Sequence, residues 1–148
     1  MNDQLKKLYQ KVIIKHNNDP LNFEKQSDSE HDIKAYNQIC GDRFNLFFNV
    51  EGDTIQNLSF HGFGCAISKA SSSVLTEAIK GKSIQEAKNV VRSFLNMIDS
   101  DDQSEEYSED FLAFSAARDF PGRQKCATLS WDAIHLFLDQ YTDEMSMI

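Results

Sequence analysis

The chain has 148 residues, a length that suits one core, so we expect residues 1–148 to form a single domain. Its net charge of -8 argues against nucleic acid as a partner, because phosphates are bound by clustered Lys and Arg. It contains no run of about 18 apolar residues and no secretory signal near its start, which argues against a membrane protein. Three cysteines is an odd count, and it favours a reducing, cytoplasmic setting over a set of disulfides.

The first half of the chain predicts a helix followed by a hairpin. Apolar residues recur at helical spacing over residues 3–17, and the polar stretch 18–30 predicts a loop. Residues 32–37 are expected to form a short edge strand. Residues 43–50 alternate apolar and polar side chains, and residues 54–61 predict a partner strand with a shifted or bulged register. The two form an antiparallel hairpin in this prediction.

Helices dominate the second half. Residues 66–79 predict a helix that ends at Gly81, a residue suited to the left-handed conformation of a C-terminal cap. Ser83 and Glu86 have the spacing of a capping box, which predicts that a second helix starts here and continues to about residue 98.

The acidic segment 99–110 predicts a solvated linker, and Ser108 caps a short helix that continues through residue 118. Residues 120–122 are Phe-Pro-Gly and predict a turn, and the last helix is expected over residues 127–141. Because the strands are grouped and then followed by helices, the pattern predicts an α+β fold. In this fold a small antiparallel sheet of two to three strands packs against about five helices.

Three cysteines and one aspartate form the candidate site: Cys40, Asp42, Cys65 and Cys126. Three sulfur ligands and one oxygen ligand make a complete tetrahedral set for zinc, and the same residues could hold an iron–sulfur cluster. Cys65 and Cys126 each precede a predicted helix, where unpaired backbone amides favour a thiolate. The alternative is that all three cysteines are small buried apolar residues.

Other polar residues have weaker patterns. Arg123 stands three residues before Cys126, a position suited to gating the site or contacting a partner, although a plain surface arginine fits equally well. His16 lies near the apolar face of the first helix, which predicts packing at the edge of the core. His31 is assigned to the polar loop and is expected to be solvated.

Four segments carry a family resemblance: Cys40-Gly41-Asp42-Arg43, residues 64–71 (Gly-Cys-Ala-Ile-Ser-Lys-Ala-Ser), residues 79–82 (Ile-Lys-Gly-Lys) and residues 120–131 (Phe-Pro-Gly-Arg-Gln-Lys-Cys-Ala-Thr-Leu-Ser-Trp). Together they resemble the IscU/NifU-like iron–sulfur cluster assembly proteins. The last segment and the long insertion before it resemble the SufU-type branch. Lys125 stands where the IscU branch has a histidine, and Asp19-Pro20-Leu21-Asn22 stands where the family has Asn-Pro-Arg-Asn.

The resemblance implies a zinc-dependent sulfurtransferase that accepts persulfide sulfur from a SufS-type cysteine desulfurase and supplies downstream Suf cluster-assembly proteins. It implies the ligands Cys40, Asp42, Cys65 and Cys126, with Cys40 as the persulfide acceptor. One alternative is a scaffold protein that assembles a [2Fe–2S] cluster on the same ligands. Another is an interaction protein with a purely structural zinc.

Overall fold

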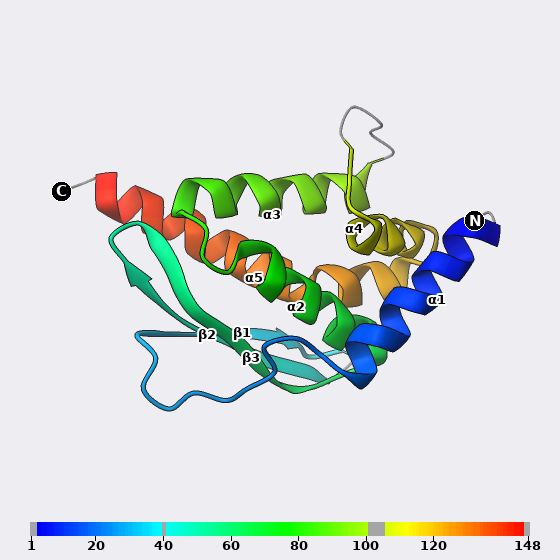
Figure 1. Ribbon diagram of the computed structural model, residues 1–148, viewed down its shortest axis with the longest axis horizontal. Helices are drawn as coiled ribbons and strands as arrows, with labels where there is room; N and C mark the ends of the chain where they lie inside the picture. Colours follow the sequence, from blue (N-terminus) through cyan, green and yellow to red (C-terminus); the bar gives the residue numbers. More distant parts are fainter. Residues whose placement is uncertain (1–2, 40, 101–105, 147–148) are drawn as a thin grey trace.

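The computed structural model describes residues 3–39, 41–100 and 106–146. Its elements, in chain order, are α1 (Asp3–Asn18), β1 (His31–Asn37), β2 (Asp42–Glu51), β3 (Thr54–Phe63), α2 (Ala66–Ile79), α3 (Ile84–Asp99), α4 (Glu109–Phe114), the 3₁₀ helix η1 (Ser115–Asp119) and α5 (Pro121–Ser146). The helices pack on one face of the sheet, and α1 crosses one end of the molecule (Figure 1). The predicted α+β fold is confirmed. Residues 101–105 of the predicted acidic linker lie outside the described residues.

The sheet has the antiparallel order β1-β2-β3, as the alternating pattern predicts. Its register shifts where Phe47 pairs with Ser59 but Asn49 pairs with Gln56, so β3 carries one extra residue. Asn57 adopts a φ of 57° at this bulge. The bulge allows Ile55 and Phe60, which an unbroken strand would place on opposite faces, both to be fully buried.

Small serines allow α2 and α5 to approach closely. The Ser71 hydroxyl donates to the carbonyl of Ala127 and accepts a hydrogen bond from Trp131 Nε1 at 2.9 Å. Ser72 Oγ and Ser130 Oγ are 2.6 Å apart between the same helices.

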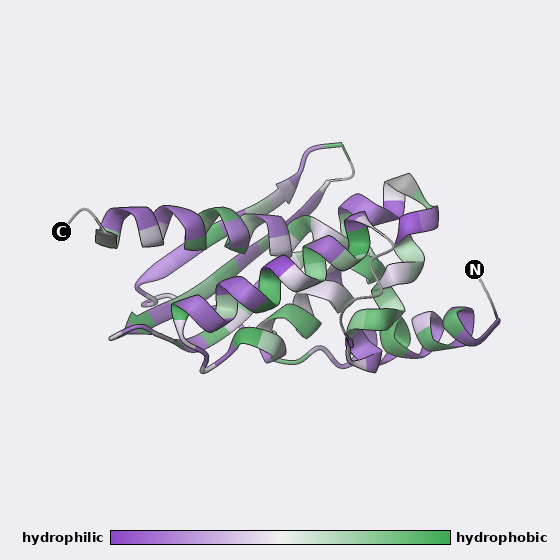
Figure 2. Ribbon diagram, turned by 90° about the horizontal axis from the view of Figure 1, so that it is seen from above, coloured by the Kyte–Doolittle hydropathy of each residue, from purple (hydrophilic) through white to green (hydrophobic). Residues whose placement is uncertain are grey.

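Hydrophilic and hydrophobic residues alternate along the helices, as expected for elements with one face on a core (Figure 2). No helix among the described residues is both long and apolar enough to cross a membrane.

The predicted capping box at Ser83 and Glu86 is confirmed, and Gly81 has the expected positive φ of 76°. The start of the last helix was predicted wrongly. Pro121 begins α5 rather than forming a turn, because proline needs no amide partner in the first helical turn. The Phe120 carbonyl accepts hydrogen bonds from the amides of Arg123 and Gln124 at 2.9 and 3.0 Å.

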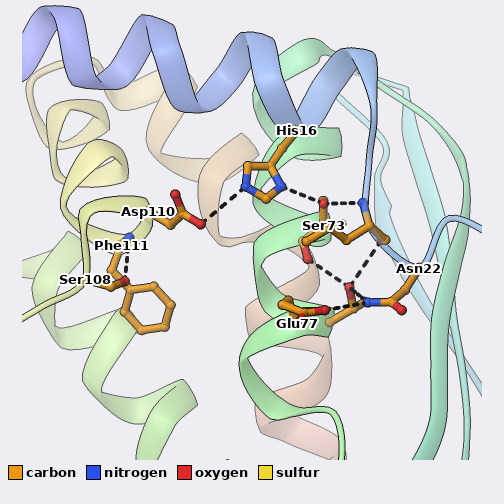
Figure 3. A network of polar contacts seen from close by, with 9 residues as sticks. His16, Asn22, Ser73, Glu77, Ser108, Asp110 and Phe111 are labelled. Atoms are coloured by element: carbon orange, nitrogen blue, oxygen red, sulfur yellow. Dashed lines mark hydrogen bonds and ion pairs between the residues drawn. The ribbon is translucent and has the colours of Figure 1, made fainter.

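Two histidines are less exposed than the sequence predicts. His31 is the first residue of β1, and its ring packs against Phe48 and Phe137 instead of lying in a solvated loop. His16 is 1% exposed and lies in a polar network instead of at an apolar edge. Its Nδ1 is 2.8 Å from Ser73 Oγ on α2, and its Nε2 is 3.3 Å from Asp110 Oδ2 on α4 (Figure 3). This histidine therefore connects α1 to two other helices.

Replacing His16 with leucine should lower the free energy of unfolding by about 1–3 kcal/mol, since the ring's contacts with Ser73 and Asp110 are lost and leucine cannot replace them. His16→Asn should recover part of that loss, because its amide nitrogen can replace Nδ1 toward Ser73. Urea unfolding of the three proteins measures both effects. A leucine variant as stable as the wild type would show that the network contributes nothing to stability.

Candidate metal centre

Three of the four predicted ligands come together at one end of the sheet. Asp42 begins β2, Cys65 caps the start of α2, and Cys126 lies in the second turn of α5. One carboxylate oxygen and the two sulfur atoms all lie within 4.8 Å of one another. Cys40, the fourth predicted ligand, lies outside the described residues.

The surroundings of Asp42 test whether these residues fit a metal ion. Asp42 is 3% exposed, and its Oδ1 accepts a hydrogen bond from the Cys65 amide at 3.1 Å. Its Oδ2 is buried and has no hydrogen-bond partner among the described residues. A buried carboxylate oxygen without a partner is costly, and a cation beside it would remove that cost. The donor set therefore fits a metal ion.

The two cysteines are positioned in different ways. The Cys65 sulfur accepts a hydrogen bond from the Ser68 amide at 3.4 Å, as the side chain of a helix N-cap does. The predicted position of Cys65 at a helix start is thus confirmed. Cys126 does not precede its helix, because Pro121 starts α5 earlier than predicted. It is 8% exposed on the inward face of α5, beyond the first turn where amides favour a thiolate most.

Glycines allow the backbone before Cys65 to press against β2. A Cβ at Gly62 would lie 2.0 Å from the Arg43 carbonyl oxygen, and its φ of 144° also favours glycine. A Cβ at Gly64 would lie 2.9 Å from Asp42 Oδ1 and 2.8 Å from a ring carbon of Phe44. The site is therefore built around a close approach that larger residues would block.

Tyr9 on α1 is a residue of the site that sequence reasoning missed. It is 9% exposed, and its hydroxyl is buried beside the Arg123 guanidinium. Burial raises the pKa of Tyr9, the Arg123 guanidinium lowers it, and negative charge at the Cys65 and Cys126 sulfurs raises it. In the sequence, Tyr9 belongs to the apolar stripe of the first helix, so its spacing predicts only core packing.

Arg123 lies at the rim of the site. It is exposed in the first turn of α5, and its guanidinium carbon is 4.8 Å from the centre of the Phe120 ring. Its influence on Tyr9 shows that it also lies close to that hydroxyl. Lys125, next to Cys126, is exposed.

The fold and the Asp/Cys/Cys cluster define a small α+β protein with a candidate metal centre. Residues 8–146 match the NifU-like N-terminal domain family, and the chain belongs to that family. It is 39% identical over 138 residues to the zinc-dependent sulfurtransferase SufU of Bacillus subtilis, covering 90% of each chain. It is 35% identical over 133 residues to the iron–sulfur cluster assembly scaffold protein IscU of Streptococcus pyogenes, covering 88% of this chain and 82% of that protein.

Solved structures support the same family. The crystal structure of FiSufU from Fervidobacterium islandicum superimposes with a TM-score of 0.75 at 30% identity, covering 88% of this chain and 96% of the other. The N-terminal part of a NifU-like protein from Brucella abortus gives a TM-score of 0.79 over 94% of this chain and 97% of the other. At 18% identity, this second likeness concerns the fold alone.

Proposed function

We propose that this chain is a zinc-dependent sulfurtransferase that accepts persulfide sulfur from a SufS-type cysteine desulfurase for iron–sulfur cluster assembly. The observation that carries the proposal is the cluster of Asp42, Cys65 and Cys126, in which a buried carboxylate oxygen lacks a partner among the described residues. A relative that is 39% identical is itself named a zinc-dependent sulfurtransferase. We place the activity in the cytoplasm, with downstream Suf cluster-assembly proteins as recipients.

Cys40, Asp42, Cys65 and Cys126 would hold the zinc. When bound, zinc supplies a cation without redox chemistry that keeps thiols ionised near neutral pH. The chain's own residues prepare the site for it. The Cys65 amide orients the Asp42 carboxylate, and the Ser68 amide supports negative charge on the Cys65 sulfur.

Sulfur acceptance is a thiol exchange at Cys40. Its thiolate attacks the outer sulfur of the desulfurase persulfide and forms a new S–S bond. The S–S bond of the desulfurase persulfide breaks, and the desulfurase cysteine leaves as a thiolate. No electron is gained or lost overall, so the step needs no oxidant or reductant.

The second candidate function is a scaffold that assembles a [2Fe–2S] cluster on the same ligands, and relatives named as scaffolds favour it. Lys125 favours the first function, because the IscU branch resembled by this chain has histidine there. Metal analysis of protein purified without oxygen separates the two functions. We expect about one zinc per chain and no colour, together with faster sulfide release when the protein is added to a SufS-type desulfurase and cysteine. Iron and acid-labile sulfide in place of zinc would contradict the proposal.

Arg123→Ala should raise the concentration of this protein needed for half-maximal sulfide release by about 3- to 10-fold, with zinc content unchanged. The expected reason is the loss of a guanidinium that can pair with a carboxylate of the desulfurase. Arg92→Ala, which removes an exposed arginine from α3, is the matched control and should behave like the wild type. If Arg123→Ala gave the wild-type concentration, Arg123 would be a plain surface residue.

A further inference from the structure

The Ser68 side chain lies beside Cys65 but is not one of the expected ligands. Ser68 is in the first turn of α2 and is 1% exposed. Its amide donates to the Cys65 sulfur at 3.4 Å, an N-cap contact that any residue except proline can make at this position. Its hydroxyl adds contacts that depend on serine, because Ser68 Oγ lies 3.5 Å from Cys65 Sγ and 3.1 Å from the Cys65 carbonyl oxygen. The capping of α2 thus accounts for the amide but does not require the hydroxyl.

The hydroxyl lies in the close approach at Gly64. A Cβ at Gly64 would lie 2.7 Å from Ser68 Oγ and 2.9 Å from Asp42 Oδ1, so both oxygens lie beside the same point of the backbone. The Cys65 amide donates to Asp42 Oδ1 at 3.1 Å. Backbone and side-chain donors are therefore gathered around two of the expected ligands. Contacts of this kind orient ligand atoms and adjust how strongly they bind a metal.

The single proton of the hydroxyl has two acceptors, and the charge on the sulfur decides between them. Beside a neutral thiol, which is a weak acceptor, the Cys65 carbonyl at 3.1 Å is the better partner. Beside a thiolate the sulfur is the better partner, because charge-assisted hydrogen bonds are roughly twice as strong as neutral ones. Ser68 Oγ is already 3.5 Å from the sulfur, so rotation of the hydroxyl is enough to change partner.

We propose that the Ser68 hydroxyl donates to the Cys65 sulfur whenever that sulfur carries negative charge, and thereby keeps Cys65 a metal ligand instead of a nucleophile. This inference rests on the proposed function and adds a residue that determines which sulfur reacts. A hydrogen bond stabilises the thiolate, and a stabilised thiolate attacks more slowly. Ser68 contacts a ligand and not the transferred sulfur, so it is a positioning residue.

The test uses the full chain, loaded with zinc and without any desulfurase. Wild type, Ser68→Ala and the control Ser73→Ala are treated with iodoacetamide in a small excess of zinc. Mass spectrometry of the peptides gives the alkylation rates of Cys65 and Cys126. Cys126 is 8% exposed, so its alkylation reports a general opening of the site. Ser73 is also buried on α2 but contacts His16, so its variant removes a hydroxyl from the same helix away from the cysteines.

We expect Cys65 to be alkylated about 3- to 10-fold faster in Ser68→Ala than in the wild type, since one hydrogen bond to a charged sulfur is worth a factor of that size. The rate at Cys126 should be unchanged. Ser73→Ala should keep the wild-type ratio of the two rates, although it loses hydrogen bonds of its own. A Ser68 that only capped α2 would show the reverse, with a lower melting temperature of Ser68→Ala and the wild-type ratio of rates.

The remaining outcomes also decide the question. Equal Cys65 rates in wild type and Ser68→Ala would overturn this inference and leave the proposed function standing. The same conclusion would follow if the rates at Cys65 and Cys126 rose together, or if Ser73→Ala changed the ratio as Ser68→Ala does, because either result would indicate a general loosening of α2. A wild type that binds no zinc would contradict both this inference and the proposed function.

Discussion

Cys40→Ser should abolish sulfur acceptance and leave the fold intact. A serine hydroxyl is not ionised near neutral pH and does not attack a persulfide, so the transfer loses its nucleophile. The described neighbours of Cys40 are open to a partner, since Ile39 is 86% exposed and Gly41 is also exposed. Cys126, in contrast, is 8% exposed inside α5. We therefore expect the persulfide of a desulfurase to reach Cys40 first.

The measurement is a persulfide map. The protein is incubated with a SufS-type desulfurase and cysteine, alkylated, digested and analysed by mass spectrometry. Label should appear on the peptide with Cys40 in the wild type and disappear in Cys40→Ser, while the circular dichroism spectra of the two proteins agree. Cys65→Ser and Cys126→Ser are the matched controls, since each also removes one expected zinc ligand, and both should still carry label on the peptide with Cys40. Persulfide found only on Cys126 would mean that the acceptor was assigned wrongly.

Elements governed by local rules could be predicted from the sequence. The alternation of Phe44, Leu46 and Phe48 predicts β2, and all three side chains are fully buried. The pair Ser83 and Glu86 predicts the start of α3 because a capping box is complete within one helical turn. Such features depend on residues that are close in the chain.

The errors arise where one local signal has two meanings. Phe-Pro-Gly at residues 120–122 is typical of a turn, yet proline is also a favoured first residue of a helix. In the structure the residues that follow Pro121 are helical, so α5 begins at Pro121 and the segment forms no turn. Because the start of this helix was predicted too late, Cys126 was wrongly expected to precede the helix, where unpaired amides favour a thiolate.

The candidate site could be predicted only in part, because most of its contacts join distant residues. Asp42, Cys65 and Cys126 could be predicted because thiols and a carboxylate are common types of metal ligand. Tyr9 has no such signature, since its place in an apolar stripe is compatible with plain packing. Nothing in the spacing of α1 indicates that one hydroxyl lies near cysteines from α2 and α5.

Gly64→Ala should remove most of the zinc and lower stability, although it adds a single methyl group. The new Cβ would lie 2.7 Å from Ser68 Oγ, 2.8 Å from the Phe44 ring and 2.9 Å from Asp42 Oδ1. Phe44 is fully buried and cannot move aside, so Asp42 or the chain before Cys65 must shift. Either shift disturbs the hydrogen bond between the Cys65 amide and Asp42, which orients the ligand. Overpacking of this kind costs roughly 1–3 kcal/mol before any loss of metal is counted.

Zinc content and melting temperature, each with and without a chelator, test this prediction. A metal that ties the start of β2 to α2 and α5 stabilises the fold, so chelation should lower the melting temperature of the wild type. Gly64→Ala should begin at the lower temperature and respond little to the chelator. Gly122→Ala is the matched control, since a Cβ there would meet no atom of a more distant described residue within 4 Å. Wild-type zinc content and chelator response in Gly64→Ala would show that this close approach does not support the metal site.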